Sequence, residues 1–352
     1  MREHNGPSPG GWHAKVAGHF AAHPFVAPRA LRNGHAMTIF ANAWADRQSR
    51  RRPILAWPCE RREFATEPGV RVVAFCHWQG DRRARPTAII IHGLEGSSGS
   101  RYVLGTAEKA FLAGLNVLRL NVRNCGGTEA LTPTLYHSGL TADLRHLTRE
   151  LIERDGLPQI VLIGFSMGGN QALKLAGELG AGAPRELRGV CAISPPIDLS
   201  LCSRAIGRPG NRFYEARFLS SLKATFRRKH ALFPDQFRPQ LLAGVRRLWD
   251  FDDLVTAPHF GFRDALDYYT QASSLRFIPR VRIPALIIQA RDDPFIPFGP
   301  FADPALASNP AVTLITPRHG GHVGFFGRPR EGEDRYWAEN RAVAFATLVS
   351  GG

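Results

Sequence analysis

The ten residues Ile160-Val161-Leu162-Ile163-Gly164-Phe165-Ser166-Met167-Gly168-Gly169 decide how the rest of the chain is interpreted. An apolar, β-branched run is followed by Gly-x-Ser-x-Gly, and residues 168–179 then have the apolar spacing of a helix. In such a strand–turn–helix the serine stands on a sharp turn at a helix N-terminus, where backbone N–H groups favour a developing negative charge. Gly164 and Gly168 allow the strand and the helix to approach closely. The pattern therefore predicts that Ser166 is a nucleophile.

Short apolar runs recur on both sides of this motif and alternate with helical stretches. The predicted strands cover residues 72–78, 87–91, 116–121, 160–163, 189–193, 285–289 and 312–315, and the predicted helices cover 101–113, 138–154 and 168–179. The central strands are almost continuously apolar, as strands covered on both faces are. This alternation predicts an α/β fold with a mostly parallel central sheet and helices on both faces.

The alternation is interrupted between the strands near residues 190 and 287. Some ninety residues there contain no clear strand, whereas residues 213–228 and 240–249 have amphipathic helical spacing. Because structureless loops of this length are uncommon in compact domains, we expect a helical cap. The expected organisation is an N-terminal basic extension packing on the core (1–60), an α/β core (61–197 and 276–352) and a helical cap insertion (198–275).

A serine hydroxyl group is a poor nucleophile unless a base takes its proton. In α/β folds with a Gly-x-Ser-x-Gly turn, the catalytic triad follows the chain order Ser, acid, His. The predicted strand 285–289 is followed by a pair of carboxylates, Asp292 and Asp293. Acids in this fold usually stand three residues beyond the last small residue of the strand, here Ala290, and just before a proline. Asp293 is therefore the first candidate for the acid, and Asp292 is the alternative.

The histidine is expected in the Gly-rich loop that follows the last predicted strand. This loop reads Arg318-His319-Gly320-Gly321-His322-Val323-Gly324-Phe325. We favour His322 as the base, because the glycines before it permit close approach to the serine, and His319 is the alternative. Both the acid and the base would then lie at carboxyl ends of strands, where α/β sheets bind ligands.

The oxyanion hole of this fold combines the N–H after the nucleophile with one from the first strand-to-helix loop. These positions predict the backbone N–H groups of Met167 and of Leu94, the latter in the loop Ile91-His92-Gly93-Leu94-Glu95-Gly96. His92 precedes the serine in the chain, and we expect it to be structural.

Other chemistries lack their signatures. The chain has no Gly-x-x-x-x-Gly-Lys-Ser/Thr phosphate loop and no His-Glu-x-x-His, and residues 164–169 do not match the Gly-x-Gly-x-x-Gly spacing of a dinucleotide site. We therefore expect no metal and no organic cofactor.

The charge of the chain is strongly positive but unevenly distributed. The net charge is +15, of which residues 1–53 carry +6 (eight basic, two acidic) and residues 198–282 carry +7 (15 basic, eight acidic). The rest of the chain is close to neutral, so nucleic acid is not an expected partner. Peripheral contact of the basic segments with an anionic membrane surface is the prediction that remains.

The cysteines and the hydropathy of the chain indicate the cellular compartment that we expect for the protein. Five cysteines are scattered without a Cys-x-x-Cys motif, and residues 1–25 lack the apolar core of a secretory signal. No uncharged apolar stretch reaches 18 residues, so no membrane-spanning helix is expected. A reduced, cytoplasmic protein is the prediction.

With these segments in view, the chain resembles the YheT-like branch of the α/β-hydrolase superfamily, from about residue 32 to residue 337. The resemblance is carried by Asn33-Gly34-His35 with Thr38, His92-Gly93-Leu94-Glu95-Gly96 with Tyr102, Tyr136-His137-Ser138-Gly139, residues 164–170, Ser194-Pro195-Pro196 with Asp198-Leu199, Phe251-Asp252-Asp253 with Thr256-Ala257-Pro258 and Gly261-Phe262, Tyr268-Tyr269 with Ser273-Ser274, Asp292-Asp293-Pro294-Phe295, and Gly320-Gly321-His322-Val323-Gly324-Phe325.

The resemblance implies a hydrolase of carboxylic esters whose triad falls on Ser166, Asp293 and His322. Short- to medium-chain acyl or lipid-like esters are the expected small-molecule substrates. Two alternatives remain: an alcohol acyltransferase that uses the same triad, and a catalytically silent binding module with a basic surface. The oligomeric state is not determined by the sequence.

Overall fold

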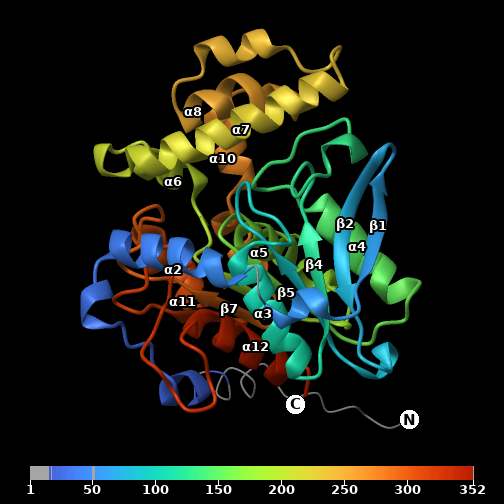
Figure 1. The fold of residues 1–352 in the computed structure, drawn as a ribbon, viewed down its shortest axis with the longest axis vertical. Helices are drawn as coiled ribbons and strands as arrows, with labels where there is room; N and C mark the ends of the chain where they lie inside the picture. Colours follow the sequence, from blue (N-terminus) through green and yellow to red (C-terminus); the bar gives the residue numbers. More distant parts are fainter. Residues whose placement is uncertain (1–15, 17, 50–51, 352) are drawn as a thin grey trace.

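The sheet has eight strands, six of which lie side by side and run parallel. The computed structural model describes residues 16, 18–49 and 52–351. The strands lie in the order β1-β2-β4-β3-β5-β6-β7-β8, and β2 pairs antiparallel with both β1 and β4 (Figure 1). Their bounds are β1 Glu60–Glu67, β2 Val70–His77, β3 Thr87–Ile91, β4 Asn116–Asn121, β5 Ile160–Phe165, β6 Leu187–Ile193, β7 Ala285–Ile288 and β8 Val312–Ile315. The α/β fold with a mostly parallel sheet is confirmed.

The sheet separates two hydrophobic cores, because successive side chains of a strand point to opposite faces. Ile89 and Ile91 of β3 pack in the core on one face, whereas Ala88 and Ile90 pack in the core on the other. All five residues of β3 are buried. This burial on both faces explains the uninterrupted apolar runs in the sequence.

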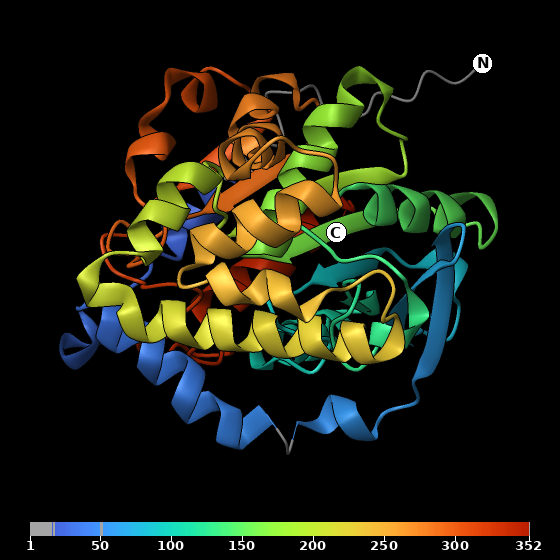
Figure 2. The same cartoon turned by 90° about the horizontal axis from the view of Figure 1, so that it is seen from above.

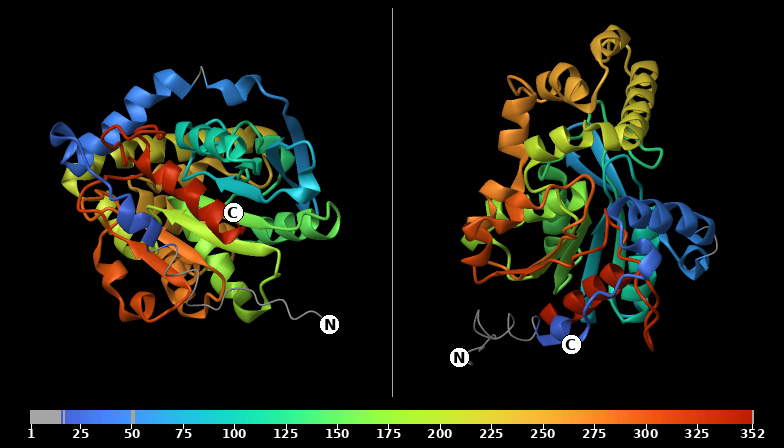
Figure 3. Two further views of the ribbon diagram at one scale, coloured as in Figure 1. Left: turned by 90° about the horizontal axis from the view of Figure 1, so that it is seen from below. Right: turned by 90° about the vertical axis from the view of Figure 1, so that its left-hand side faces the viewer.

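Helices cover both faces. The bounds are α2 Gly34–Ser49, α3 Arg101–Leu112, α4 Ala142–Glu153, α5 Met167–Leu179, α6 Leu199–Ile206, α7 Arg212–Leu232, α8 Leu248–Phe251, α9 Ala257–His259, α10 Ala265–Ala272, α11 Pro304–Ala307 and α12 Trp337–Val349. Buried side chains of α4 and α5 belong to the first core, and those of α3 and α12 to the second. Seen from below, α12 crosses under the sheet near the C-terminus (Figure 3, left).

The helices α6 to α10 stand together over one end of the sheet (Figure 1; Figure 3, right). They arise between β6 and β7, as the long interval without strands predicts. The longest of them, α7, runs across the top of the molecule (Figure 2). This end is the one at which the parallel strands terminate, so the helices cover the region where ligands bind in α/β sheets.

The expectation of one helix over residues 240–249 is wrong. A 3-10 helix covers Pro239–Gly244, and α8 begins only at Leu248. The Asp250 carboxylate accepts hydrogen bonds from the backbone N–H groups of Arg246 and Arg247 (both 2.9 Å), and it thereby caps a new helix. Beyond α8 the chain continues as a π-helical segment, Asp252–Thr256.

The first strand was not predicted from the sequence. In β1 only Phe64 is buried, and charged residues occupy most of the other positions. This pattern is typical of an edge strand that is protected against further pairing. Arg62 anchors β1 to α4 and its C-terminal turn through Glu150 (2.7 Å) and Asp155 (2.6 Å).

The N-terminal region packs against the C-terminal part of the core. Met37 and Ala41 of α2 form a small buried cluster with Phe326 and Tyr336. In the described part of the chain, no helix combines the length and apolarity that crossing a bilayer requires.

Candidate active site

Ser166 lies in the turn between β5 and α5 with an unusual backbone conformation (φ 51°, ψ −119°). Its N–H donates to Ile193 O of the neighbouring strand (2.8 Å), so the turn is held to the sheet. A Cβ placed on Gly168 would meet the backbone oxygens of Ile91 (2.6 Å) and His92 (2.7 Å). A larger residue at Gly168 would therefore push α5 away from β3. The local sequence thus produces a strained turn that presents Ser166 at the N-terminus of α5.

Three of the predicted side chains meet in one hydrogen-bonded chain. His322 Nε2 lies 3.0 Å from Ser166 Oγ, and His322 Nδ1 lies 2.9 Å from Asp293 Oδ2. The Asp293 side chain is fully buried, and its Oδ1 accepts hydrogen bonds from the N–H groups of Phe295 (2.9 Å) and Ile296 (3.1 Å). These bonds fix the carboxylate, which in turn orients the imidazole toward Ser166.

The neighbouring residues form a separate pair on the surface. Asp292 Oδ2 lies 3.3 Å from His319 Nδ1, and Asp292 Oδ1 accepts a hydrogen bond from Gly321 N (2.9 Å). Asp292 and His319 line a shallow depression with Arg291 and Arg318, apart from the cavity that contains Ser166. The alternatives that the sequence left open for the acid and the base therefore pair with each other and not with Ser166.

Thr38 of α2 positions the histidine loop, a role that sequence reasoning did not assign. Its Oγ1 accepts a hydrogen bond from His322 N (2.8 Å) and donates one to Gly34 O (2.7 Å). Only the resemblance segment Asn33-Gly34-His35 with Thr38 pointed to this region. The contact spans 284 residues, so no local pattern reveals it.

The loop after β3 lies directly beside Ser166. A Cβ placed on Gly93 would be 3.1 Å from Ser166 Cβ, and both Leu94 and Met167 line the same cavity as Ser166. Within the described residues, neither Leu94 N nor Met167 N donates a hydrogen bond to another protein group. Both predicted oxyanion donors are thus available at the cavity.

His92 has a structural environment. Its Nδ1 donates to Gly93 O (2.7 Å), and its Nε2 accepts from Val122 N (3.1 Å). Complete burial lowers the pKa of His92 to about 4, so the imidazole is neutral at physiological pH. It connects the loop after β3 to the end of β4.

Glu95 joins the loop after β3 to the overlying helix α7. Its Oε2 accepts hydrogen bonds from Ser221 Oγ (2.6 Å) and Thr225 Oγ1 (3.0 Å), and its Oε1 accepts one from Tyr136 Oη (2.6 Å). Glu95 N also donates to Tyr136 Oη (3.1 Å). One carboxylate therefore ties the residue after Leu94 to α7.

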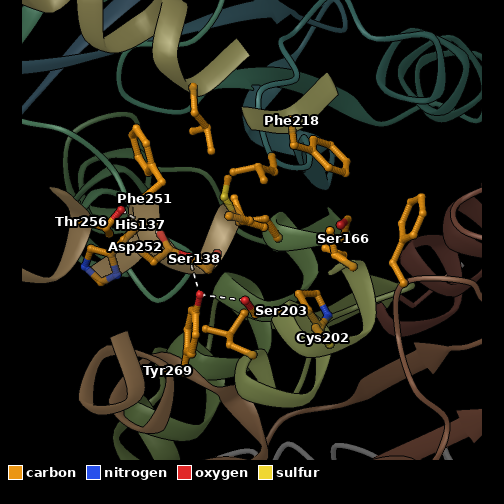
Figure 4. A pocket seen from close by; sticks show the side chains of 18 of the residues that line it. His137, Ser138, Ser166, Cys202, Ser203, Phe218, Phe251, Asp252, Thr256 and Tyr269 are labelled. Carbon is orange, nitrogen blue, oxygen red and sulfur yellow. Dashed lines mark hydrogen bonds between the residues drawn. The ribbon is translucent and has the colours of Figure 1, made fainter. Parts of the chain in front are cut away.

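Ser166 opens into a cavity of about 100 Å³ beneath the helices that follow β6. Apolar side chains of these helices and of the loop after β7 form much of its wall, among them Leu199, Ile206, Phe218, Leu222, Leu248, Phe251, Phe295 and Ile296. Polar groups gather on the side away from Ser166 (Figure 4). The cavity therefore combines apolar walls with Ser166 at one side and polar groups at the other.

Comparisons with known proteins agree with this geometry. The family profile of the alpha/beta hydrolase fold matches residues 86–329. YheT of Escherichia coli (strain K12), whose esterase activity is a provisional assignment, is 32% identical over 325 residues, which cover 92% of this chain and 93% of YheT. The monoacylglycerol lipase of Saccharomyces cerevisiae is 31% identical over 264 residues, which cover 73% of this chain and 58% of the lipase.

Among solved structures, the esterase Pf2001 of Pyrococcus furiosus superposes with a TM-score of 0.51 at 19% identity, over 83% of this chain and 91% of Pf2001. At that identity the likeness shows the fold alone. The family profile and the identity to YheT carry the assignment: the chain belongs to the α/β-hydrolase family and, within it, to the branch that includes YheT.

Proposed function

We propose that the protein hydrolyses carboxylic esters through an acyl-enzyme on Ser166. The observation that carries the proposal is the chain from Ser166 Oγ through His322 to Asp293, placed at the wall of a largely apolar cavity. The matched relatives named as esterase and lipase support the same reaction class.

The proposed reaction proceeds in two steps. As Ser166 Oγ attacks the ester carbonyl carbon, His322 Nε2 takes the hydroxyl proton, and Asp293 stabilises the resulting imidazolium. The carbonyl oxygen becomes an oxyanion that accepts hydrogen bonds from the N–H groups of Leu94 and Met167. The tetrahedral intermediate then expels the alcohol, which takes the proton from His322. Water repeats the sequence on the acyl-enzyme and releases the carboxylic acid.

The cavity wall supports acyl or lipid-like esters of short to medium chain. Apolar side chains such as Phe218 and Leu222 of α7 would contact a hydrocarbon arm and remove it from water, at about 0.8 kcal/mol per methylene group buried.

Activity-based labelling tests the proposal directly. A fluorophosphonate should label the protein, and peptide mapping should place the adduct on Ser166. The protein should also hydrolyse p-nitrophenyl esters, with an optimum within a C2–C16 series. Absence of both labelling and turnover would contradict the proposal, and it would favour a binding module instead.

An alcohol acyltransferase would use the same serine and differ only in the acceptor of the acyl group. Product analysis with an acyl ester and added ethanol separates the two. We expect free acid as the main product, and a dominant ethyl ester would identify the transferase.

Replacing Glu95 with glutamine is expected to lower kcat about tenfold with little change in KM. The amide cannot accept all the hydrogen bonds that the carboxylate receives from α7 and Tyr136, so the loop that carries Leu94 N–H would shift. Removal of one oxyanion donor costs about 100- to 1,000-fold, so a displaced donor should cost less. Steady-state kinetics with a p-nitrophenyl ester measure the effect. Glu153→Gln, at an exposed site on α4, is the matched control and should retain wild-type kinetics.

Contact with an anionic membrane surface remains a prediction from the charge pattern. The structure adds that six of the ten large exposed apolar side chains among the described residues lie on the segments between β6 and β7: Leu201, Phe213, Leu232, Leu241, Leu254 and Leu266. Basic and apolar side chains on one segment favour interfacial binding. Liposome co-sedimentation should increase with the fraction of anionic lipid and decrease with salt, whereas equal binding to neutral vesicles would contradict the role of charge.

A further inference from the structure

Asp252, a half-buried residue with a carboxyl side chain, lines the same cavity as Ser166. Asp252 begins the π-helical segment Asp252–Thr256, and π-helical turns occur frequently at functional sites. In Figure 4, Asp252, Thr256 and Tyr269 lie on one side of the cavity and Ser166 on the other. The reaction at Ser166 makes no use of this carboxyl group.

The partners of Asp252 are hydroxyl groups. Its Oδ1 accepts a hydrogen bond from Thr256 Oγ1 (2.8 Å), and its Oδ2 accepts one from Tyr269 Oη (2.7 Å). Among the described residues, no Lys, Arg or His forms an ion pair with it. Burial raises the pKa of Asp252 to about 6, because the charged form is poorly solvated there.

The carboxyl group therefore retains acceptor capacity toward the cavity. A carboxylate has about four acceptor sites, and the two hydroxyl partners use two of them. A carboxylate without a positively charged partner next to apolar walls loses solvation free energy, unless further hydrogen bonds compensate the loss. A substrate group that donates a hydrogen bond would supply one.

The groups around Asp252 both donate and accept hydrogen bonds. Tyr269 Oη lies 3.0 Å from Ser203 Oγ, and Ser203 lines the cavity. Tyr268, whose Oη accepts a hydrogen bond from Ser138 N (3.0 Å), contributes a second phenol to the cavity wall. An ammonium ion only donates hydrogen bonds, so it could not accept the proton of the Tyr268 hydroxyl group, whereas an alcohol both donates and accepts.

We propose that Asp252, Ser203, Tyr268 and Tyr269 bind a hydroxyl group carried by the substrate, so that the enzyme selects esters with a hydroxylated arm. This inference rests on the proposed ester hydrolysis at Ser166 and names the substrate class of that site. The apolar part of the cavity would hold the hydrocarbon between the ester and the hydroxyl group.

Paired substrates that differ by one hydroxyl group test the inference. The hydroxyl group is placed on the acyl side in p-nitrophenyl hydroxyalkanoates and on the alcohol side in glycerol mono-octanoate, with p-nitrophenyl alkanoates and propyl octanoate as the matched controls. We expect the hydroxylated member of one series to have a kcat/KM about 10- to 100-fold higher, because without it the polar groups stay unpaired. The series that shows the preference identifies the arm that enters the cavity.

Variants at Asp252 link the preference to the site. Asp252→Leu should reduce the ratio of the two kcat/KM values to about 1, and Asp252→Asn should reduce it several-fold while preserving the shape of the side chain. Asp253→Asn is the matched control: Asp253 does not line the cavity, and its carboxylate caps Ala265 N (2.8 Å), so the ratio should not change. Melting temperatures of all variants verify folding.

The outcomes separate this inference from the proposed function. A ratio near 1 in wild type for both series, or a ratio that Asp252→Asn and Asp252→Leu leave unchanged, would overturn the hydroxyl site while hydrolysis of the simple esters persists. A preference for ω-amino esters over the hydroxylated ones would also overturn it. If the wild-type protein hydrolysed none of the esters, this result would instead contradict the proposed reaction at Ser166.

Discussion

Replacing Ser166 with alanine is expected to lower kcat for a p-nitrophenyl ester by about 10⁶-fold, the loss typical of a serine nucleophile. His322→Ala should cost nearly as much, since Ser166 Oγ has no other base within hydrogen-bonding distance among the described residues. Because the two groups act as one unit, the double variant should be no slower than either single variant. Active-site-titrated kinetics of the three proteins measure these values.

The matched control for this series is His319→Ala. His319 belongs to the same Gly-rich loop, but it pairs with Asp292 and does not line the cavity of Ser166. It should keep kcat within a few-fold of wild type. If Ser166→Ala retained more than about 10% of wild-type activity, the acyl-enzyme mechanism would have to be abandoned.

The second large effect is expected for the acid. Asp293→Asn should lower kcat by about 10⁴-fold, because the asparagine amide does not hold the imidazole in the tautomer that accepts the serine proton. Two backbone N–H groups donate to Asp293 Oδ1, so the side chain should stay in place while the electrostatic role is lost.

Asp292→Asn provides the comparison at the adjacent position. Asp292 accepts a hydrogen bond from Gly321 N, so its replacement should disturb the histidine loop and lower kcat by no more than about tenfold. Steady-state kinetics of both variants, with melting temperatures as a folding check, decide between them. A larger loss for Asp292→Asn than for Asp293→Asn would assign the acid to Asp292.

The features that were predictable from the sequence depend on neighbouring residues. The buried strands read as apolar runs because both faces of the parallel sheet are covered, as β3 and β5 show. The turn at Ser166 was predictable because its glycines and flanking elements lie within ten residues. Edge strand β1 was not predicted, because charged residues at most of its positions obscure the alternation of apolar and polar side chains. The break within residues 240–249 was not predicted either, because the amphipathic pattern continues across the point where Asp250 caps a new helix.

Contacts between distant residues required the folded chain. The sequence placed Asp292 and Asp293, and His319 and His322, at the right strand ends, but the direction of each side chain depends on how two loops meet. The structure pairs Asp293 with His322 and Asp292 with His319. The sequence by itself therefore determined the fold class and the turn that carries Ser166, because local patterning specifies both. Only the tertiary structure decided which carboxylate faces the histidine at Ser166, that Thr38 and Glu95 hold the two loops, and that Asp252 enters the cavity, because each of these depends on packing between segments far apart in the chain.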